Sequence, residues 1–313
     1  MTLLDGSQFF INEHEENQDY ITVLQWKDAG HEIQPAPAKA PPDNRESAYS
    51  ARPIFEAPAD DSAIWRYMSF EQFISFLLTE SLWFSRGSTL RSMDPYEGQL
   101  PKENATIDPA TLLSRLYKDQ KFESSQIDQF SHTHRVLQGR FQNAALNNCW
   151  NLGDHESHAM WKVYGRGKNS VALRSTFSRL KSSFGPYSDY DVLIGKIRYI
   201  DYKVAELDES NYLNLYLHKA PFYSSENELR CIIVDDGDIP FFPDDEPIPL
   251  AYYGRELTFR PGAPVPVDLN GLFHEVVVGP EADPWFYDSV CGVLKKFGLD
   301  HISVVRSLVL TYV

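Results

Sequence analysis

Cysteine, positive charge and long apolar runs are all scarce in this sequence. Its three cysteines, Cys149, Cys231 and Cys291, are far apart and each lies beside apolar residues. This spacing indicates neither a disulfide framework nor a zinc site, and we expect a protein of the reducing cytoplasm. The 29 Lys and Arg residues are outnumbered by 44 Asp and Glu, which leaves a net charge of −15. Such a charge argues against a protein whose main task is to coat DNA or RNA, although nucleic acid as a target of a local site is not excluded.

Membrane and export signals are also missing from the pattern. No segment approaches the roughly 20 apolar residues of a membrane span. The first residues, MTLLDGSQFFINEHEENQDY, have no basic region followed by an apolar stretch. We therefore expect a soluble protein that is not exported and has no membrane partner. Hydrophobic residues make up 42% of the chain and aromatic residues 13%, which is ample for a packed core.

Composition divides the chain into three parts. Residues 1–33 could supply two short strands and are predicted to form an N-terminal appendage. Residues 34–61 contain six prolines and few core-forming residues, a composition typical of a linker or an extended surface segment. Residues 62–313 are predicted to form the main domain.

The pattern of the main part mixes helices and strands without a regular βαβ rhythm. Ser69 and Gln72 have the spacing of a capping box before an apolar helix, and the aromatic runs around Trp65 and Trp83 read as flanking strands. A further helix is predicted from about Asp154 to Tyr164, a strand over 170–175, and mainly helix over 101–146. We expect an α+β fold with a mainly antiparallel mixed sheet and helices on its flanks.

The segment YSSENELRCIIV places Glu226, Glu228 and Arg230 two residues apart, just before an apolar run. In a strand these side chains share one face at steps of roughly 6.6–6.8 Å. One interpretation is a solvated row on an edge strand. The other is the wall of a cleft, in which the carboxylates act as a base or a charge stabiliser and Arg230 is the structural partner that keeps a carboxylate ionised.

Other site types are weakly supported. His155 and His158 lack a third metal ligand, and no metal site is predicted. YGRGKNS lacks the spacing of a phosphate-binding loop, and no nucleophile has a base that the sequence can place. The aromatic residues, among them Tyr67 and Trp83, are either core or a platform on which a nucleotide base stacks.

Three segments together resemble an uncharacterised bacterial family, domain of unknown function 2971. They are WRYMSFEQFISFLLTESLWFSRGSTLRSMDPYEG, NCWNLGDHESHAMWKVYGRGKNSVAL and KAPFYSSENELRCII. The resemblance covers roughly residues 64–280. The family label implies no activity, so the function has to come from the site.

The order of these elements is also distantly similar to the ADP-ribosyltransferase plan. That similarity implies that Arg66 binds NAD and that Ser175 and Thr176 support the site from a central strand; Tyr67 and Trp83 are the aromatic residues expected to stack on the nucleotide. It further implies that Glu226 orients the acceptor. Glu228 would then stabilise the oxocarbenium-like transition state, because positive charge develops on the ribose as nicotinamide leaves.

The sequence departs from this plan at Phe177, where a small polar residue is usual, and Glu156 has no counterpart in it. The leading hypothesis is a transferase that uses NAD or a related nucleotide on an unknown macromolecular target, as an effector of phage defence or a toxin. The alternatives are a non-catalytic module that binds a nucleotide or a partner, and a metal-dependent nuclease. The nuclease would use four carboxylates as oxygen ligands: Asp94, Glu97, Glu156 and Glu228.

Overall fold

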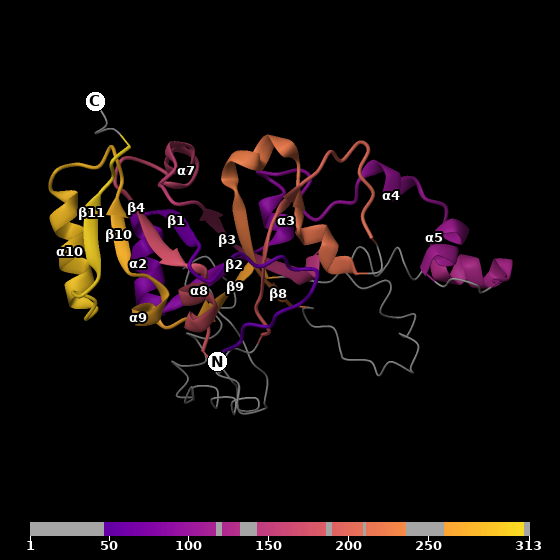
Figure 1. Ribbon diagram of the computed structural model, residues 1–313, viewed down its shortest axis with the longest axis horizontal. Helices are drawn as coiled ribbons and strands as arrows, with labels where there is room; N and C mark the ends of the chain where they lie inside the picture. The colour runs from indigo at the N-terminus through magenta and orange to yellow at the C-terminus, as the bar shows by residue number, and fades with distance from the viewer. Residues whose placement is uncertain are drawn as a thin grey trace, which may run out of the picture. The chain divides into compact units, whose positions relative to one another are not determined.

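The computed structural model describes residues 47–116, 121–131, 143–185, 190–208, 211–235 and 260–309. The predicted appendage and residues 34–46 of the proline-rich segment lie outside the described residues. All described residues belong to one compact unit, residues 45–313. They form a nine-stranded, mostly antiparallel sheet with flanking helices, so the predicted α+β fold is confirmed (Figure 1). No helix among these residues is long and apolar enough to cross a membrane.

The sheet is built around one central strand, β3. In spatial order the main path is β11 (Ser303–Arg306), β10 (Glu275–Val278), β4 (Ser170–Thr176), β1 (Ala63–Ser69), β3 (Ala145–Leu152), β2 (Ser81–Arg86) and β9 (Gly262–Pro266). A branch from β3 adds β8 (Glu228–Val234) and then β5 (Leu193–Lys196). Of the described pairs in this sheet, β10 with β11 is parallel and the others are antiparallel. Strand β8 therefore lies inside the sheet, which rules out the edge-strand interpretation of its charged row.

Strand β3 pairs with three strands along its two edges. Strand β8 pairs along one edge from Ala145 to Asn151. The other edge is shared, because β1 pairs only near Leu152 and β2 only near Asn147. Between these pairs the sheet is split along β3, and the split lies at the positions around Cys149.

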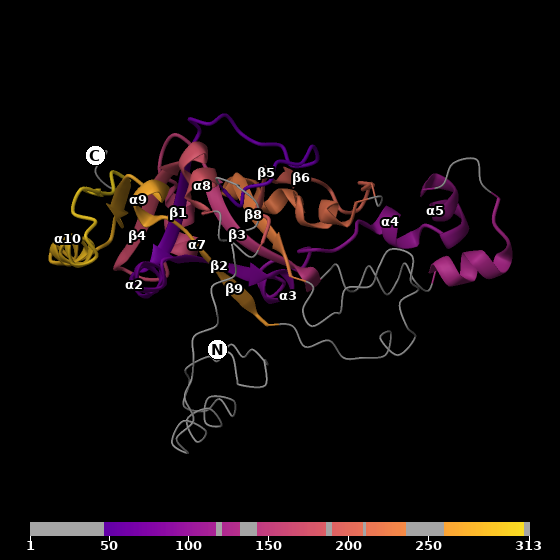
Figure 2. The same cartoon turned by 90° about the horizontal axis from the view of Figure 1, so that it is seen from below.

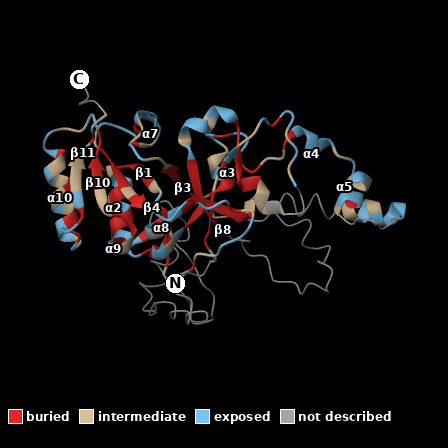
Figure 3. Ribbon diagram, in the orientation of Figure 1, coloured by how far each residue is buried: buried red, intermediate tan, exposed pale blue. Residues whose placement is uncertain are grey.

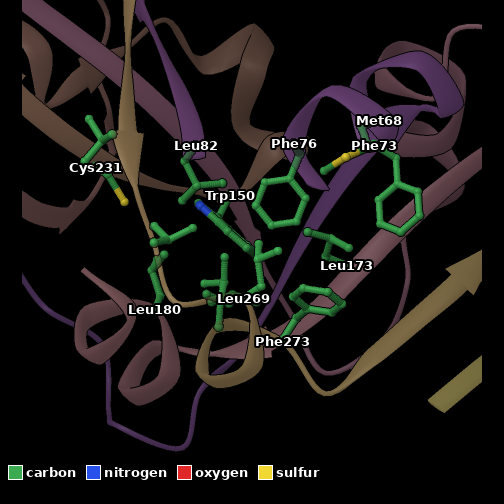
Figure 4. Close-up of a cluster of buried hydrophobic side chains, with 14 of the residues drawn as sticks. Met68, Phe73, Phe76, Leu82, Trp150, Leu173, Leu180, Cys231, Leu269 and Phe273 are labelled. Carbon is green, nitrogen blue, oxygen red and sulfur yellow. The ribbon is translucent and has the colours of Figure 1, made fainter. Parts of the chain in front are cut away.

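One face of the sheet carries the main hydrophobic core, covered by α2 (Phe70–Thr79), α8 (Phe177–Ser183), α9 (Leu269–Leu272) and α10 (Phe286–Lys296) (Figures 1 and 2). Helix α2 begins at the predicted capping box, with Ser69 and Gln72 bonded reciprocally. Its side chains Phe73 and Phe76 enter the core beside Phe273 (Figure 4). Each such burial contributes about 1.5–3 kcal/mol.

The other face carries α7 (His158–Tyr164), the 3-10 turns η1 (Tyr212–Tyr216) and η2 (Pro221–Glu226), and a two-stranded piece formed by β6 (Arg198–Tyr199) and β7 (His218–Lys219). Helix α7 begins later than the predicted Asp154. The reason is that Ser157 caps it, with its hydroxyl accepting from the amide of Met160 at 3.4 Å. The stretch 101–146, predicted as mainly helical, contains α4 (Lys102–Thr106) and α5 (Pro109–Leu116), and β3 begins before it ends.

Arg86 joins two residues that are far apart in the chain. Its buried guanidinium donates to the carboxylate of Asp235 at 2.6 Å and to the carbonyl of Arg260 at 2.6 Å. Asp235 and Arg260 also pair directly, at 3.0 Å. The chain that leaves the sheet after Asp235 therefore returns to the same point at Arg260.

The described end of the proline-rich segment is packed against the sheet. Tyr49 forms a bridge with Val192, and Phe55 is buried beside Gly195, where an added Cβ would meet it at 3.1 Å. Residues 47–61 thus contribute apolar contacts to the unit.

Candidate functional site

Five charged side chains form a continuous row beside η2 and β8, in the order Glu226, Lys219, Glu228, Arg230 and Glu97. Lys219 contacts Glu226 and lies 2.9 Å from Glu228. Arg230 donates to Glu228 at 2.6 Å and to both oxygens of Glu97, at 2.6 and 3.0 Å. We call this row the charge ladder. Its charges alternate, with three carboxyl groups and two cations.

The register of β8 on β3 explains why Glu228 and Arg230, the buried residues of the ladder on β8, lie next to each other. Glu228 lies opposite Asn151 and Arg230 opposite Cys149 on β3, so both side chains point to the same face. Figure 3 shows β3 and β8 as largely buried strands. Arg230 also donates to the carbonyl of Tyr216 at 2.8 Å. Every polar contact of this guanidinium is therefore made inside the protein.

Burial and neighbouring charges shift the pKa values of the ladder residues in opposite directions. Burial alone would raise the pKa of Glu228, but Arg230 and Lys219 outweigh it and hold that pKa well below its usual range. Burial would lower the pKa of Arg230, but Glu228 and Glu97 hold it well above its usual value. Burial raises the pKa of Glu97 although Arg230 opposes the shift. The central pair, Glu228 with Arg230, is thus firmly ionised at neutral pH.

The ladder reaches solvent at Glu226. Its side chain is 13% exposed, against 3% for Glu228. The hydroxyl of Tyr164, at the end of α7, donates to Glu226 at 2.9 Å. Burial, and next the charge of Glu226, raise the pKa of Tyr164, so this hydroxyl stays protonated. Lys219 also lies over the ring of Tyr223, 5.2 Å from its centre.

Arg66 lies at the split of the sheet. Its guanidinium donates to the carbonyl of Cys149 at 2.7 Å and to the side-chain oxygen of Asn148 at 3.2 Å, and it lies 5.9 Å from the ring centre of Trp150. Among the described residues it has no carboxylate partner. Burial lowers the pKa of Arg66. A half-buried cation without a counter-ion is costly unless an anion completes it.

Cys149 is in contact with both Arg66 and the charge ladder, through different atoms. Arg66 binds its carbonyl, while its thiol is hydrogen-bonded to Glu228. Burial, and then the charge of Glu228, raise the pKa of this thiol well above its usual value. Although Cys149 is on the central strand, its side chain is only partly buried. Arg66 is in register with Leu173 of the main core, so its side chain lies on the opposite face of the sheet from Glu228 and Arg230, and the two groups contact Cys149 from different sides.

The remaining predicted residues have structural contacts elsewhere. The carboxylate of Glu156 accepts from Trp161 at 2.8 Å, from the hydroxyl of Ser307 at 2.6 Å and from the amide of Leu308 at 2.6 Å. It anchors the segment after β11. Ser175 is buried and bonded to the carbonyl of Leu272, and Thr176 caps α8.

The two predicted stacking residues differ in exposure. Tyr67 is buried, accepts from the amide of Ser157 at 2.7 Å, and packs edge-on against Trp161. Trp83 is 49% exposed on β2. Of the two, only Trp83 therefore offers a ring to solvent.

The four carboxylates of the nuclease hypothesis are not gathered in one place. Glu97 and Glu228 are bound to Arg230, and Glu156 lies by the segment after β11. Asp94 is buried, with one oxygen accepting from the amide of Tyr96 at 2.9 Å and the other without a described partner. No group of three potential metal ligands occurs in the part of the chain that the structure describes.

Sequence reasoning missed Lys219 and Tyr164. Lys219 is seven residues before Glu226, in HKAPFYSSENELR, and a turn of 3-10 helix brings it back. Tyr164 comes from a different element, α7. Lys219 could have been suspected from its place in an apolar stretch. Tyr164 belongs to the group of aromatic residues that the sequence offers as core or stacking platform, but nothing in the sequence links it to Glu226.

Comparisons with known proteins add no relative. No family model, no curated protein and no solved structure matches the chain. The resemblance to the uncharacterised bacterial family stays a prediction, and the function is inferred from the geometry of the site.

Proposed function

We propose that this protein binds NAD or a closely related nucleotide and transfers its ADP-ribosyl group to an acceptor. The observation that carries the proposal is that Arg66 is a cation without a described carboxylate partner, in a protein whose charge ladder also brings one carboxylate, Glu226, partly to solvent. Oxidised NAD carries the complementary pair, a cationic pyridinium and an anionic pyrophosphate.

The chemistry suits this arrangement. The bond between the ribose C1′ and the nicotinamide nitrogen breaks, and its electron pair leaves with nicotinamide. An oxygen or nitrogen of the acceptor then bonds to C1′ and loses its proton to solvent. Positive charge develops on the ribose in between, so a fixed carboxylate stabilises the transition state more than the ground state.

Arg66 is suited to the anionic part of the ligand. A guanidinium binds phosphate oxygens through paired, charge-assisted hydrogen bonds. The two described hydrogen bonds of Arg66 both come from one nitrogen, Nη1. A phosphate would then supply the missing counter-charge at the split of the sheet.

The test combines binding with product release. We expect the purified protein to bind NAD by calorimetry and to release nicotinamide when protein and nucleic-acid acceptors are offered. Arg66→Gln should weaken NAD binding about tenfold or more, since a hydrogen bond to a charged group contributes about 1.5–3 kcal/mol. Arg198→Gln, an exposed arginine on β6, is the matched control and should bind NAD like the wild type. Absence of both binding and nicotinamide release from the wild type would refute the proposal.

A second candidate is a non-catalytic module that binds a nucleotide or a partner. It is favoured by the burial of Glu228, because a carboxylate fully engaged in ion pairs is also what a purely structural network requires. This candidate predicts NAD binding that depends on Arg66, without any nicotinamide release under the same conditions.

A further inference from the structure

Building on the NAD-dependent function proposed above, we infer that Glu226, and not Glu228, is the carboxylate that meets the ribose of the ligand. Lys219 and Tyr164 are the positioning residues that hold it. The distant similarity to the transferase plan implies the opposite assignment, with Glu228 at the ribose. The hydrogen-bonding capacity of the two carboxylates distinguishes these assignments.

Glu228 has no acceptor capacity left for a ligand. An ionised carboxylate offers about four lone-pair sites. Glu228 receives the Nε and Nη2 of Arg230, at 2.6 and 3.3 Å, the ammonium of Lys219 at 2.9 Å and the thiol of Cys149. A ribose hydroxyl could bond to it only by displacing one of these partners. With its side chain 3% exposed, Glu228 is also out of reach of a ligand on the surface.

Glu226 has two described donors, the hydroxyl of Tyr164 on one oxygen and the ammonium of Lys219 on the other. About two of its four lone-pair sites are therefore open. Its carboxylate is fixed at both oxygens, faces solvent in part, and ends the charge ladder. A group oriented in advance in this way stabilises developing charge without reorganisation during the reaction.

Lys219 connects the ligand-facing carboxylate, Glu226, with the buried one, Glu228. Its ammonium touches both carboxylates, and it is the described cation closest to Glu226. Without it, Glu226 and Glu228 would repel each other. Lys219 therefore fixes the distance between the ligand-facing carboxylate and the buried one.

The experiment compares Glu226→Gln with Glu228→Gln in steady-state nicotinamide release from NAD. We expect Glu226→Gln to lower kcat at least about a hundredfold, the usual effect of removing one electrostatic stabiliser, with an unchanged unfolding midpoint. Glu228→Gln should lower the unfolding midpoint, and its loss of kcat per folded molecule should be at least about tenfold smaller than that of Glu226→Gln. Tyr164→Phe, which touches Glu226 and not Glu228, should lower kcat without loss of fold. A folded Glu228→Gln that binds NAD but is inactive, beside active Glu226→Gln and Tyr164→Phe, would overturn the assignment.

A labelling experiment separates this assignment from the proposed function. Treatment of the native protein with a water-soluble carbodiimide and glycine methyl ester, followed by peptide mass spectrometry, should modify Glu226 and spare Glu228 and Glu97. Modification of Glu228 ahead of Glu226 would overturn the assignment whatever the activity. A wild type that neither binds nor cleaves NAD, but is labelled at Glu226, would refute the NAD-dependent function and leave Glu226 as the ligand-facing carboxylate of another reaction.

Discussion

Replacing Arg230 by methionine is the most direct test of the charge ladder. The guanidinium is fully buried and neutralises Glu228 and Glu97, which are 3% and 1% exposed. Methionine has a similar length and fills the space, so the change removes charge and hydrogen bonds with little loss of volume. It leaves two buried carboxylates and the carbonyl of Tyr216 without this donor. Breaking a buried ion pair by removing one partner costs about 3–5 kcal/mol, and the orphaned carbonyl adds about 1–3 kcal/mol.

The loss should depend on pH with a defined sign. In the wild type, the lowered pKa of Glu228 contributes stability that is present above the pKa of an unfolded Glu, about 4.3, and is lost as the pH falls. In Arg230→Met, Glu97 loses the guanidinium that opposes burial and its already raised pKa rises further, while Glu228 keeps Lys219 but loses the larger of its two charge partners. Glu97 then takes up a proton on folding. The stability of the variant therefore falls as the pH rises, and the difference from the wild type is largest at neutral pH.

The assay is urea unfolding followed by tryptophan fluorescence, between about pH 5 and about pH 8. Arg198→Met, at an exposed position, is the control and should change the unfolding free energy by less than about 0.5 kcal/mol. If Arg230→Met lost less than about 1 kcal/mol at neutral pH, or lost the same amount at every pH, the ladder would not have the energetic role described here.

Three further predictions concern other parts of the fold. Ser69→Ala should destabilise the protein by about 1 kcal/mol in urea unfolding, since it removes the capping box of α2; no change would mean that the cap is dispensable. The thiol of Cys149 should react with iodoacetamide at pH 7.5 much more slowly in the native protein than in the unfolded chain, because burial and then Glu228 raise its pKa; equal rates by mass spectrometry would contradict this. Arg86→Met should cost about 3 kcal/mol or more in urea unfolding, because it removes the buried donor to Asp235 and to the carbonyl of Arg260; a loss below about 1 kcal/mol would contradict this.

Local features of the fold were readable from the sequence. The capping box at Ser69, the strand that ends at Thr176 and the buried strand after Glu228 follow from patterns within a few residues. The start of α7 was placed too early, since the sequence offers several polar residues there and Ser157 is the one that caps the helix.

Most of the site depends on long-range contacts that no local pattern encodes. Arg230 was predicted as a structural partner of a carboxylate, and it does pair with Glu228. Its second partner, Glu97, lies 133 residues away. Arg66 was selected by similarity to the transferase plan, but its place at the split depends on a hydrogen bond across 83 residues to Cys149. Which carboxylate lies near solvent is set by such packing rather than by sequence spacing.

The split along β3 has a mechanical consequence. Strand β1, which carries Arg66, pairs with β3 only near Leu152. Strand β8, which follows Glu226, pairs with β3 along its whole length. A small change in twist between the two halves of the sheet would therefore move Arg66 relative to β8 without breaking the longer β3–β8 pairing. The short β1–β3 pairing is thus a point at which the sheet can deform.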